Sequence, residues 1–266
     1  MSYAKGHVRR LDKDHLISIK HAKHGARLRA LRAVPMPASY DSRTQGIIGP
    51  VKNQGDCGSC WDFSGTSCAE IAFNKAGIGG GPTSFVLSEE YTLSCYQNGQ
   101  CNGDDNTTVL DWAKGHGLPL AADYGAYQAA PGACLWTPTM KLYQIDDWGF
   151  ACTDPDMAYG VPSNDDIKSA IYHYGAVGCA VAADDAFEAY TSGVFQDSGS
   201  TEINHDVVLV GWDDADGAWI LRNSWDTSWG EGGYMRIAYG ANQIGTEAVW
   251  AVKNPPSTVD SKFDRG

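Results

Sequence analysis

The stretch from Asn53 to Ser64 could carry covalent chemistry, because it combines a cysteine with the start of a helix. Glycines precede Cys60, and an apolar pattern with aromatic residues begins directly behind it. A thiol at a helix start faces the positive end of the helix dipole and unpaired N–H groups, which favour thiolate over thiol. Cys60 is therefore placed to be a nucleophile.

Two other interpretations of this cysteine are structural. Cys60 could be buried packing or half of a disulfide, or it could form a redox or metal pair with Cys57. A redox pair should follow a strand in a small βαβ unit, and a structural zinc site should show a second pair at matching spacing. Neither context is present in the sequence, so we predict no metal site and no cofactor.

The five residues from Cys57 to Trp61 fit the local signature C-G-[SA]-C-[WY], and with it the chain resembles the papain-like cysteine peptidases. Two further signatures of that family follow in order. His205 begins an apolar run, and Asn223-Ser224-Trp225 is followed by Ser-Trp-Gly-Glu-Gly-Gly-Tyr at 228–234. The resemblance extends from near Pro35 to near Lys253.

The resemblance implies a role for each matching residue. Cys60 would attack the substrate carbonyl, His205 would act as general acid and base, and Asn223 would orient the imidazole. Gln54 would join the Cys60 backbone N–H in an oxyanion hole, where fixed donors stabilise the developing charge. Trp225 would shield the contact between Asn223 and His205 from water. The residues expected to bind substrate are Gly58, Gly103, Asp104, Asn204, Asp206 and Trp225.

The cysteine pairing also follows from the resemblance. Carried over by motif, it implies disulfides Cys57–Cys101 and Cys95–Cys134. The sequence alone allows three pairings of four cysteines. Cys68, Cys152 and Cys179 have no assigned partner.

Three acids stand where the family usually has small neutral residues: Asp62, Asp104 and Asp206. We hypothesise that they lie near the S2 region and that Asp62 and Asp206 are neighbours across the lobe interface, where two buried carboxylates would share a proton. An acidic S2 floor would favour a basic residue at the second position before the cleaved bond, or make cleavage strongly dependent on pH. Alternatively, each acid hydrogen-bonds to a nearby backbone group.

Composition limits the partners of the chain. It has 266 residues, 43% of them apolar and 20% charged, with a formal net charge of −12, which argues against nucleic acid as a partner. The sequence contains no run of 18 apolar residues, so it does not indicate a membrane span. Eight cysteines suit an oxidising compartment, so we expect a secreted or lysosomal/vacuolar protein, although no signal peptide is visible. We expect a monomer that binds protein or peptide substrates.

Residues 1–34 form a basic N-terminal arm. They carry nine Lys or Arg against Asp12 and Asp14, a net +7, which leaves about −19 for residues 35–266. One interpretation is a solvated, disordered tail. The other is a pro-segment that lies on the acidic body and inhibits it by covering the cleft. Propeptides of the resembled family are longer and carry helical motifs that this arm lacks.

The apolar pattern predicts helices in the first half and short strands with glycine turns in the second. Three helices are expected: one over 61–76, one with Ser88 as its N-cap, and one over 165–173 opened by Ser163 and Asn164. The expected strands are 143–150, 176–183, 204–212, 219–225 and 232–237.

The resemblance implies a two-lobed α+β fold with the active site in the cleft between the lobes. The peptidase domain would span 35–254, with a mainly helical left lobe at roughly 46–142. The β-barrel-like right lobe would take roughly 35–45 and 143–254, and 255–266 would be a C-terminal tail.

These observations predict a cysteine endopeptidase that cuts peptide bonds through a thioester on Cys60. Three alternatives remain: an exopeptidase of the same fold, a peptide-binding homologue that has lost catalysis, and a transacylase or ligase. No occluding insertion that would block one end of the cleft is visible, which favours the endopeptidase.

Overall fold

The computed structural model describes residues 2–82, 84–96 and 98–254, so the predicted C-terminal tail lies outside the described residues. Its α-helices are α1 (Lys13–Arg32), α2 (Cys60–Lys75), α3 (Glu89–Cys95), α4 (Asn106–Gly115), α5 (Ala121–Tyr124), α6 (Asn164–Tyr174) and α7 (Asp185–Glu188). Its strands are β1 (Ser39–Asp41), β2 (Asp147–Phe150), β3 (Val177–Val181), β4 (Val194–Phe195), β5 (His205–Asp213), β6 (Ala218–Arg222), β7 (Tyr234–Ala238) and β8 (Thr246–Val252). Short 3-10 turns cover Ser42–Gln45, Gln100–Asn102, Pro155–Met157 and Ala241–Gln243.

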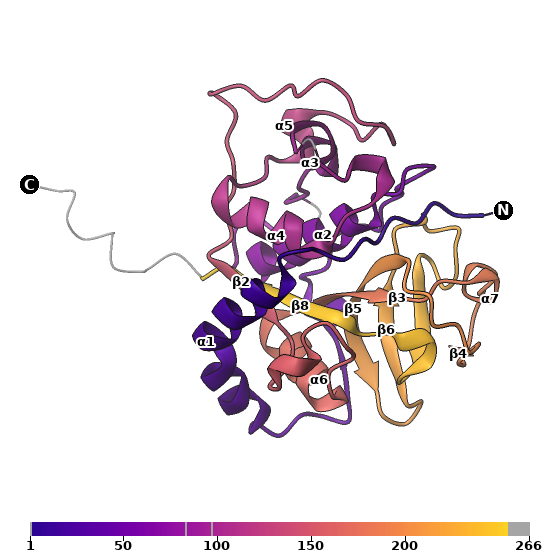
Figure 1. Ribbon diagram of the computed structural model, residues 1–266. Helices are drawn as coiled ribbons and strands as arrows, with labels where there is room; N and C mark the ends of the chain where they lie inside the picture. Colours follow the sequence, from indigo (N-terminus) through magenta and orange to yellow (C-terminus); the bar gives the residue numbers. More distant parts are fainter. Residues whose placement is uncertain (1, 83, 97, 255–266) are drawn as a thin grey trace, which may run out of the picture.

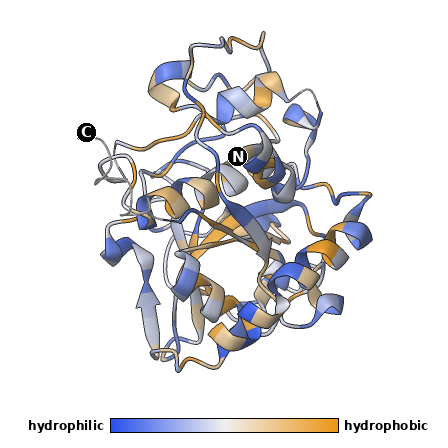
Figure 2. Cartoon of the chain, turned by 90° about the vertical axis from the view of Figure 1, so that its left-hand side faces the viewer, coloured by the Kyte–Doolittle hydropathy of each residue, from blue (hydrophilic) through white to orange (hydrophobic). Residues whose placement is uncertain are grey.

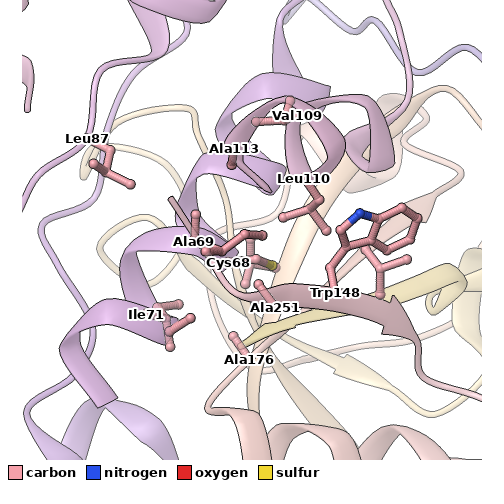
Figure 3. Close-up of a cluster of buried hydrophobic side chains, with 14 of the residues drawn as sticks. Cys68, Ala69, Ile71, Leu87, Val109, Leu110, Ala113, Trp148, Ala176 and Ala251 are labelled. Atoms are coloured by element: carbon pink, nitrogen blue, oxygen red, sulfur yellow. The ribbon is translucent and has the colours of Figure 1, made fainter. Parts of the chain in front are cut away.

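Helices α2 to α5 gather in one half of the molecule, around the almost wholly buried α2. Gly65 lets α4 approach α2 closely, because a Cβ at that position would lie 2.6 Å from the Val109 Cβ and 2.8 Å from the Asn106 carbonyl oxygen. Figure 3 shows the resulting core, in which Val109 and Leu110 of α4 face α2 and Trp148 of β2 closes one side. The tight packing fixes the position of the start of α2.

The other half is an eight-stranded sheet in the order β2-β8-β3-β5-β6-β7-β4, with β1 paired to β5. Its described pairings are antiparallel except that of β4 with β7. Apolar residues concentrate in the sheet, at the centre of Figure 2. A second core, with Trp219 and Trp250 among its largest members, fills the space beside these strands. The fold is therefore the predicted two-lobed α+β class.

Most predicted elements are confirmed. Helices α2, α3 and α6 lie where the pattern placed them, and Ser88 and Ser163 accept N-cap hydrogen bonds from the backbone of Tyr91 and Asp166. Strands β5, β6 and β7 match three predicted strands. Helix α4 and strand β8 had no predicted counterpart.

The basic arm is ordered, so the disordered-tail interpretation is wrong for residues 2–34. Residues 2–12 run between the helical half and the sheet, after which α1 packs beside α6 and β2 (Figure 1). The buried side of α1 carries Leu16, Lys20, His24 and Leu28 at intervals of four. Since two of these four residues are polar, hydrophobic periodicity does not reveal the helix.

The predicted disulfides Cys57–Cys101 and Cys95–Cys134 are both present. Cys60, Cys68, Cys152 and Cys179 are free and buried. Among the described helices, none is long and apolar enough to cross a bilayer.

Candidate active site

Cys60 is the first residue of α2 and is fully buried. Its sulfur accepts a hydrogen bond from the backbone N–H of Gly6, at 3.2 Å. Burial raises the pKa of this thiol far above its usual range, and the Asp206 carboxylate adds to the shift. The backbone N–H groups of Gly6, Trp61 and Asp206 oppose it without reversing it. With the arm in place, Cys60 is therefore a neutral thiol.

His205 is the first residue of β5, and its ring is oriented from two sides. Nε2 lies 2.9 Å from the Asn223 Oδ1, and the ring stacks on Trp225 with the centroids 4.5 Å apart. Nδ1 is buried and has no hydrogen-bond partner among the described residues. Burial lowers the pKa of His205 to about 3, which keeps the imidazole neutral. No described hydrogen bond joins the ring to the Cys60 sulfur; the sulfur lies instead against the backbone of Asp206, the next residue along β5.

Gln54 presents a fixed amide beside Cys60. Its side chain is buried, and its Oε1 accepts a hydrogen bond of 2.6 Å from the Ser224 hydroxyl. Its Nε2 donates to the carbonyl oxygens of Cys57 at 2.9 Å and Ala4 at 3.0 Å. A carbonyl of the arm therefore occupies the donor that the resemblance assigned to an oxyanion.

The arm pairs with the body through its backbone on one side of Cys60. Asp104 N–H donates to the Gly6 carbonyl at 2.9 Å, and Val8 N–H donates to the Asp104 carbonyl at 2.8 Å. His7 N–H donates to the Asn204 carbonyl at 3.2 Å. Asp104 and Asn204, both predicted to bind substrate, thus bind the polypeptide of the arm.

Two glycines of the body let the arm come this close. A Cβ on Gly103 would lie 2.5 Å from the Gly6 carbonyl oxygen, and one on Gly58 would lie 2.7 Å from that of Lys5. Such distances are too short for a real Cβ, so Gly103 requires glycine while the arm is bound; Gly58 requires it even without the arm, because a Cβ there would lie 2.6 Å from the Cys101 carbonyl oxygen.

On the other side of Cys60, the arm contacts Trp225 and α7. The Tyr3 ring stacks on Trp225 with centroids 4.3 Å apart and an interplanar angle of 8°. Lys5 Nζ donates to the Ala183 carbonyl at 2.7 Å and lies 2.6 Å from a Glu188 carboxylate oxygen. The arm therefore extends past Cys60 in both directions.

One prediction about the three acids is wrong. Asp62 lies inside the helical half, where its Oδ1 accepts a hydrogen bond from Thr66 at 3.0 Å. Burial raises its pKa, and its charged surroundings are Glu89 and Lys52. Asp206 instead faces the arm, so the two carboxylates lie in different environments. They are separated because Asp62 points into the left lobe from the first turn of α2.

Asp104 follows the alternative interpretation of a local hydrogen bond. Its Oδ1 accepts from the backbone N–H of Asp105 at 2.8 Å and from the Thr108 hydroxyl at 3.0 Å. Its carboxylate is therefore engaged at the start of α4, while its backbone meets the arm.

Asp206 does reach the cleft, where it binds His7 of the arm together with a second acid, Glu247, which the sequence did not single out. Asp206 and Glu247 of β8 both contact the imidazole of His7. The available signal was an acid, Glu247, directly before the apolar run of residues 248–252. Nothing in the sequence places that strand beside β3 and the head of β5.

Comparison with known proteins identifies the family of the chain. The family described as papain family cysteine protease matches residues 36–252. Oryzain beta chain of Oryza sativa subsp. japonica is 36% identical over 227 residues, which cover 82% of this chain and 46% of the relative. Probable cysteine protease RD21B of Arabidopsis thaliana is 35% identical over 244 residues, covering 84% and 48%. The chain thus spans about half the length of these relatives.

Solved structures give the same result. Digestive procathepsin L 3 from the larval midgut of Tenebrio molitor aligns with a TM-score of 0.72 and 27% identity, covering 83% of this chain and 71% of that one. The Carica candamarcensis cysteine protease CMS1MS2, solved in complex with E-64, aligns with a TM-score of 0.66 and 29% identity, covering 82% and 100%. The chain belongs to the papain family of cysteine proteases.

Proposed function

We propose that the chain is a cysteine endopeptidase that cleaves peptide bonds through a thioester on Cys60. We also propose that its N-terminal arm, while docked, keeps the enzyme inactive. The observation that supports the catalytic part is the orientation of His205: its Nε2 lies 2.9 Å from the Asn223 Oδ1, while its Nδ1 has no hydrogen-bond partner within the described part of the chain. Such an imidazole has one ring nitrogen left to exchange a proton with the unbridged thiol.

The chemistry follows from these groups. With the arm displaced, water and substrate reach the cleft, and proton transfer from the Cys60 thiol to His205 gives a thiolate and an imidazolium. The sulfur attacks the substrate carbonyl carbon, and its oxygen gains charge beside the Gln54 Nε2 and the Cys60 N–H. The imidazolium protonates the leaving amine as the C–N bond breaks. A water molecule, deprotonated by His205, then hydrolyses the thioester and releases the acid.

The docked arm is not itself a substrate, because the group that it presents to the Cys60 sulfur is an N–H and not a carbonyl. Gly6 places an N–H on the Cys60 sulfur, so this contact offers no carbonyl carbon for attack. The same docking leaves the thiol and the His205 imidazole both uncharged, because burial disfavours each ion. A neutral pair is a weak nucleophile and base.

The path of the arm favours an endopeptidase over an exopeptidase. It contacts Trp225 through Tyr3 on one side of Cys60 and Asp104 through Val8 on the other. A polypeptide can therefore lie across Cys60 without ending there, as internal cleavage requires.

Two further expectations belong to this proposal. A chain with two disulfides is stable in an oxidising compartment, so we place the protein outside the cytosol, as a secreted or a lysosomal/vacuolar enzyme. We also propose that it acts as a monomer on protein or peptide substrates.

The test is covalent labelling of Cys60 in an arm-displaced variant. A Cβ at Gly6 would lie 1.8 Å from the Gly58 carbonyl oxygen, so Gly6→Ala cannot keep the arm in the cleft. Full-length Gly6→Ala should bind one equivalent of E-64 by intact mass and cleave a denatured protein, whereas the native chain should react much more slowly. Gly25→Ala on α1 is the matched control and should behave as the native chain.

Cys60→Ser in the Gly6→Ala background should lose the adduct and the cleavage together. If Gly6→Ala forms no adduct, or if the adduct persists after Cys60→Ser, the assignment of Cys60 is wrong. If labelling occurs but no protein is cut, the chain is a peptide-binding homologue instead.

A further inference from the structure

The arm places one imidazole in an acidic pocket next to Cys60. The His7 side chain is only 4% exposed, its Nδ1 lies 3.0 Å from the Asp206 Oδ2, and its Nε2 lies 3.4 Å from the Glu247 Oε2. We call the site formed by Asp206 and Glu247 the carboxylate pocket. The imidazole there is held as a cation between two acids.

Within the described residues, the basic partners of the carboxylate pocket come from the arm. Every described ion pair of Asp206 and Glu247 is with His7 or Arg9. Asp206 is only 2% exposed, and its buried Oδ1 has no hydrogen-bond partner among the described residues. When the arm leaves, residues 35–82, 84–96 and 98–254 of the body offer no basic partner in an ion pair to the two acids of the pocket.

The surroundings make the pocket more acidic still. Asp104 and Asp105 face Asp206, and Asp105 also faces Glu247. Glu247 additionally holds a left-handed backbone conformation, with φ 56°, which is unfavourable for a residue with a side chain. Burying acids together opposes folding, so a cationic ligand that neutralises their charge has a large effect.

The position of the pocket identifies which substrate residue it would meet. His7 directly follows Gly6, whose N–H touches the Cys60 sulfur, and its own N–H pairs with the Asn204 carbonyl. The pocket therefore receives the side chain adjacent to the residue at the sulfur, on the Asp104 side. In the resembled family this is the S2 region, which contacts the second residue before the cleaved bond.

We propose that Asp206 and Glu247 make the enzyme select substrates with a basic residue, Arg or Lys, second before the cleaved bond, and that His7 of the arm imitates this residue. The proposal rests on the proposed function. A guanidinium can pair with two carboxylates at once through its planar set of donors, and an ammonium can donate to both. An apolar side chain would instead leave both acids buried and unpaired.

The experiment compares fluorogenic peptides that differ only at this position, with Arg, Lys, Leu or Phe. The enzyme is the full chain carrying Gly6→Ala, which empties the pocket. We expect kcat/KM for the Arg and Lys peptides to exceed that for Leu by about tenfold or more, since a charge-assisted pair contributes that much. In Glu247→Gln and Asp206→Asn the ratio of Arg to Leu should fall toward one.

Asp216→Asn is the matched control, because Asp216 is a half-exposed acid paired with Arg236 away from the cleft. It should leave the ratio unchanged. Equal use of Arg and Leu by the parent enzyme, or a ratio unaffected by Glu247→Gln, would overturn the proposal. Because E-64 labelling of Cys60 and cleavage of the Leu peptide are measured in the same samples, loss of selectivity is distinguished from failure of the proposed function.

Discussion

The contact of Gly6 with Cys60 acts on charge as well as on access. With the arm docked, both Cys60 and His205 are buried, and burial raises the pKa of the thiol and lowers that of the imidazole to about 3. Each shift disfavours the ionised form of its own group while the arm is docked. We expect displacement of the arm to let solvent reach both groups and so to favour their ionised forms.

His7 makes the docking of the arm dependent on pH. Burial alone would lower its pKa, but Asp206 and Glu247 outweigh burial and raise the pKa to about 9. In a released arm the pKa returns to about 6.5. The His7 contribution to docking is therefore complete below about pH 6.5 and is lost as the pH rises through about 9. Burial also raises the pKa of Glu247, to about 8, while His7 and Arg9 of the arm oppose this shift.

We therefore expect His7→Ala to expose Cys60 most strongly at the acidic end of this range. The measurement is the rate of Cys60 alkylation in His7→Ala divided by that in the native chain, at about pH 6, 7.5 and 9.5. The ratio should be about tenfold or more at pH 6 and approach one above pH 9. His15→Ala, an exposed position on α1, should give a ratio near one throughout. A His7→Ala ratio that stays constant with pH would contradict the role of His7.

At the scale of elements, α1 is anchored by one carboxylate of the body. Lys20 Nζ lies 3.1 Å from the Asp147 Oδ1 and 3.8 Å from the centre of the Trp148 ring. Lys23 and Lys114 also pair with Asp147. Burial would raise the pKa of Asp147, but hydrogen bonds from these lysines hold it well below its usual range. The carboxylate thus neutralises a buried lysine that would otherwise oppose docking.

Asp147→Ala should detach α1 from the body. Because the Lys20 side chain is only 7% exposed, loss of its partner should cost about 3 kcal/mol of docking free energy. The measurement is amide hydrogen exchange of residues 13–32 in the Cys60→Ser background, where protection should fall while that of α2 stays.

Lys23→Ala is the control for this experiment. The Lys23 side chain is 56% exposed, so its loss should cost less than about 1 kcal/mol. Equal protection of α1 in Asp147→Ala and Lys23→Ala would argue against the anchor.

The linker between α1 and β1 contains a sequence that suits the carboxylate pocket. Arg32, at the end of α1, precedes Ala33 and Val34, and both of these are exposed. We expect a second copy of the enzyme to cut the Ala33–Val34 bond with Arg32 in its pocket. Intact mass of Cys60→Ser, incubated with a trace of Gly6→Ala enzyme, should show loss of residues 1–33. Arg32→Ala should slow this cut about tenfold, whereas Arg29→Ala should not; cutting at the same rate in both would contradict it.

Local patterns in the sequence predicted the framework but not the arm. Helix α2 and strands β5 and β6 are apolar runs bounded by turn residues, and their stability depends on burial that the pattern itself expresses. The face of α1 includes Lys20 and His24, whose burial depends on Asp147, more than a hundred residues away. No local property of residues 13–32 carries that information.

The residues of the candidate site also fall into those that a local motif predicts and those that only the fold brings together. Cys60, His205 and Asn223 stand in signature motifs, so their residue types and order were sufficient to select them. Glu247 has no motif and becomes relevant only because β8 pairs with β3 next to β5. The error on Asp62 has a different cause, since Asp62 lies two residues after Cys60 in α2 and is therefore turned about 200° around the helix, into the lobe rather than across the cleft.

At the scale of the whole molecule, opposite charges meet across a large surface. The arm carries +7 and the rest of the chain about −19, and pairs such as Lys5–Glu188 and Arg9–Glu247 join them. Attraction between exposed charges weakens as salt rises, with a screening length of about 8 Å at physiological ionic strength. The buried pairs of His7 and Lys20 are screened less, so they supply the part of docking that salt does not remove.

The linker at 33–38 is the covalent tether between the arm and the body, and cutting it leaves every contact of residues 2–32 in place. A tethered segment competes for its site at an effective concentration of about millimolar, whereas a severed one obeys the law of mass action. After the cut, the fraction of free enzyme is set by the dissociation constant and the total protein concentration. At high concentration the cleaved protein would therefore remain inhibited, and dilution into a larger volume would release the arm and activate the enzyme.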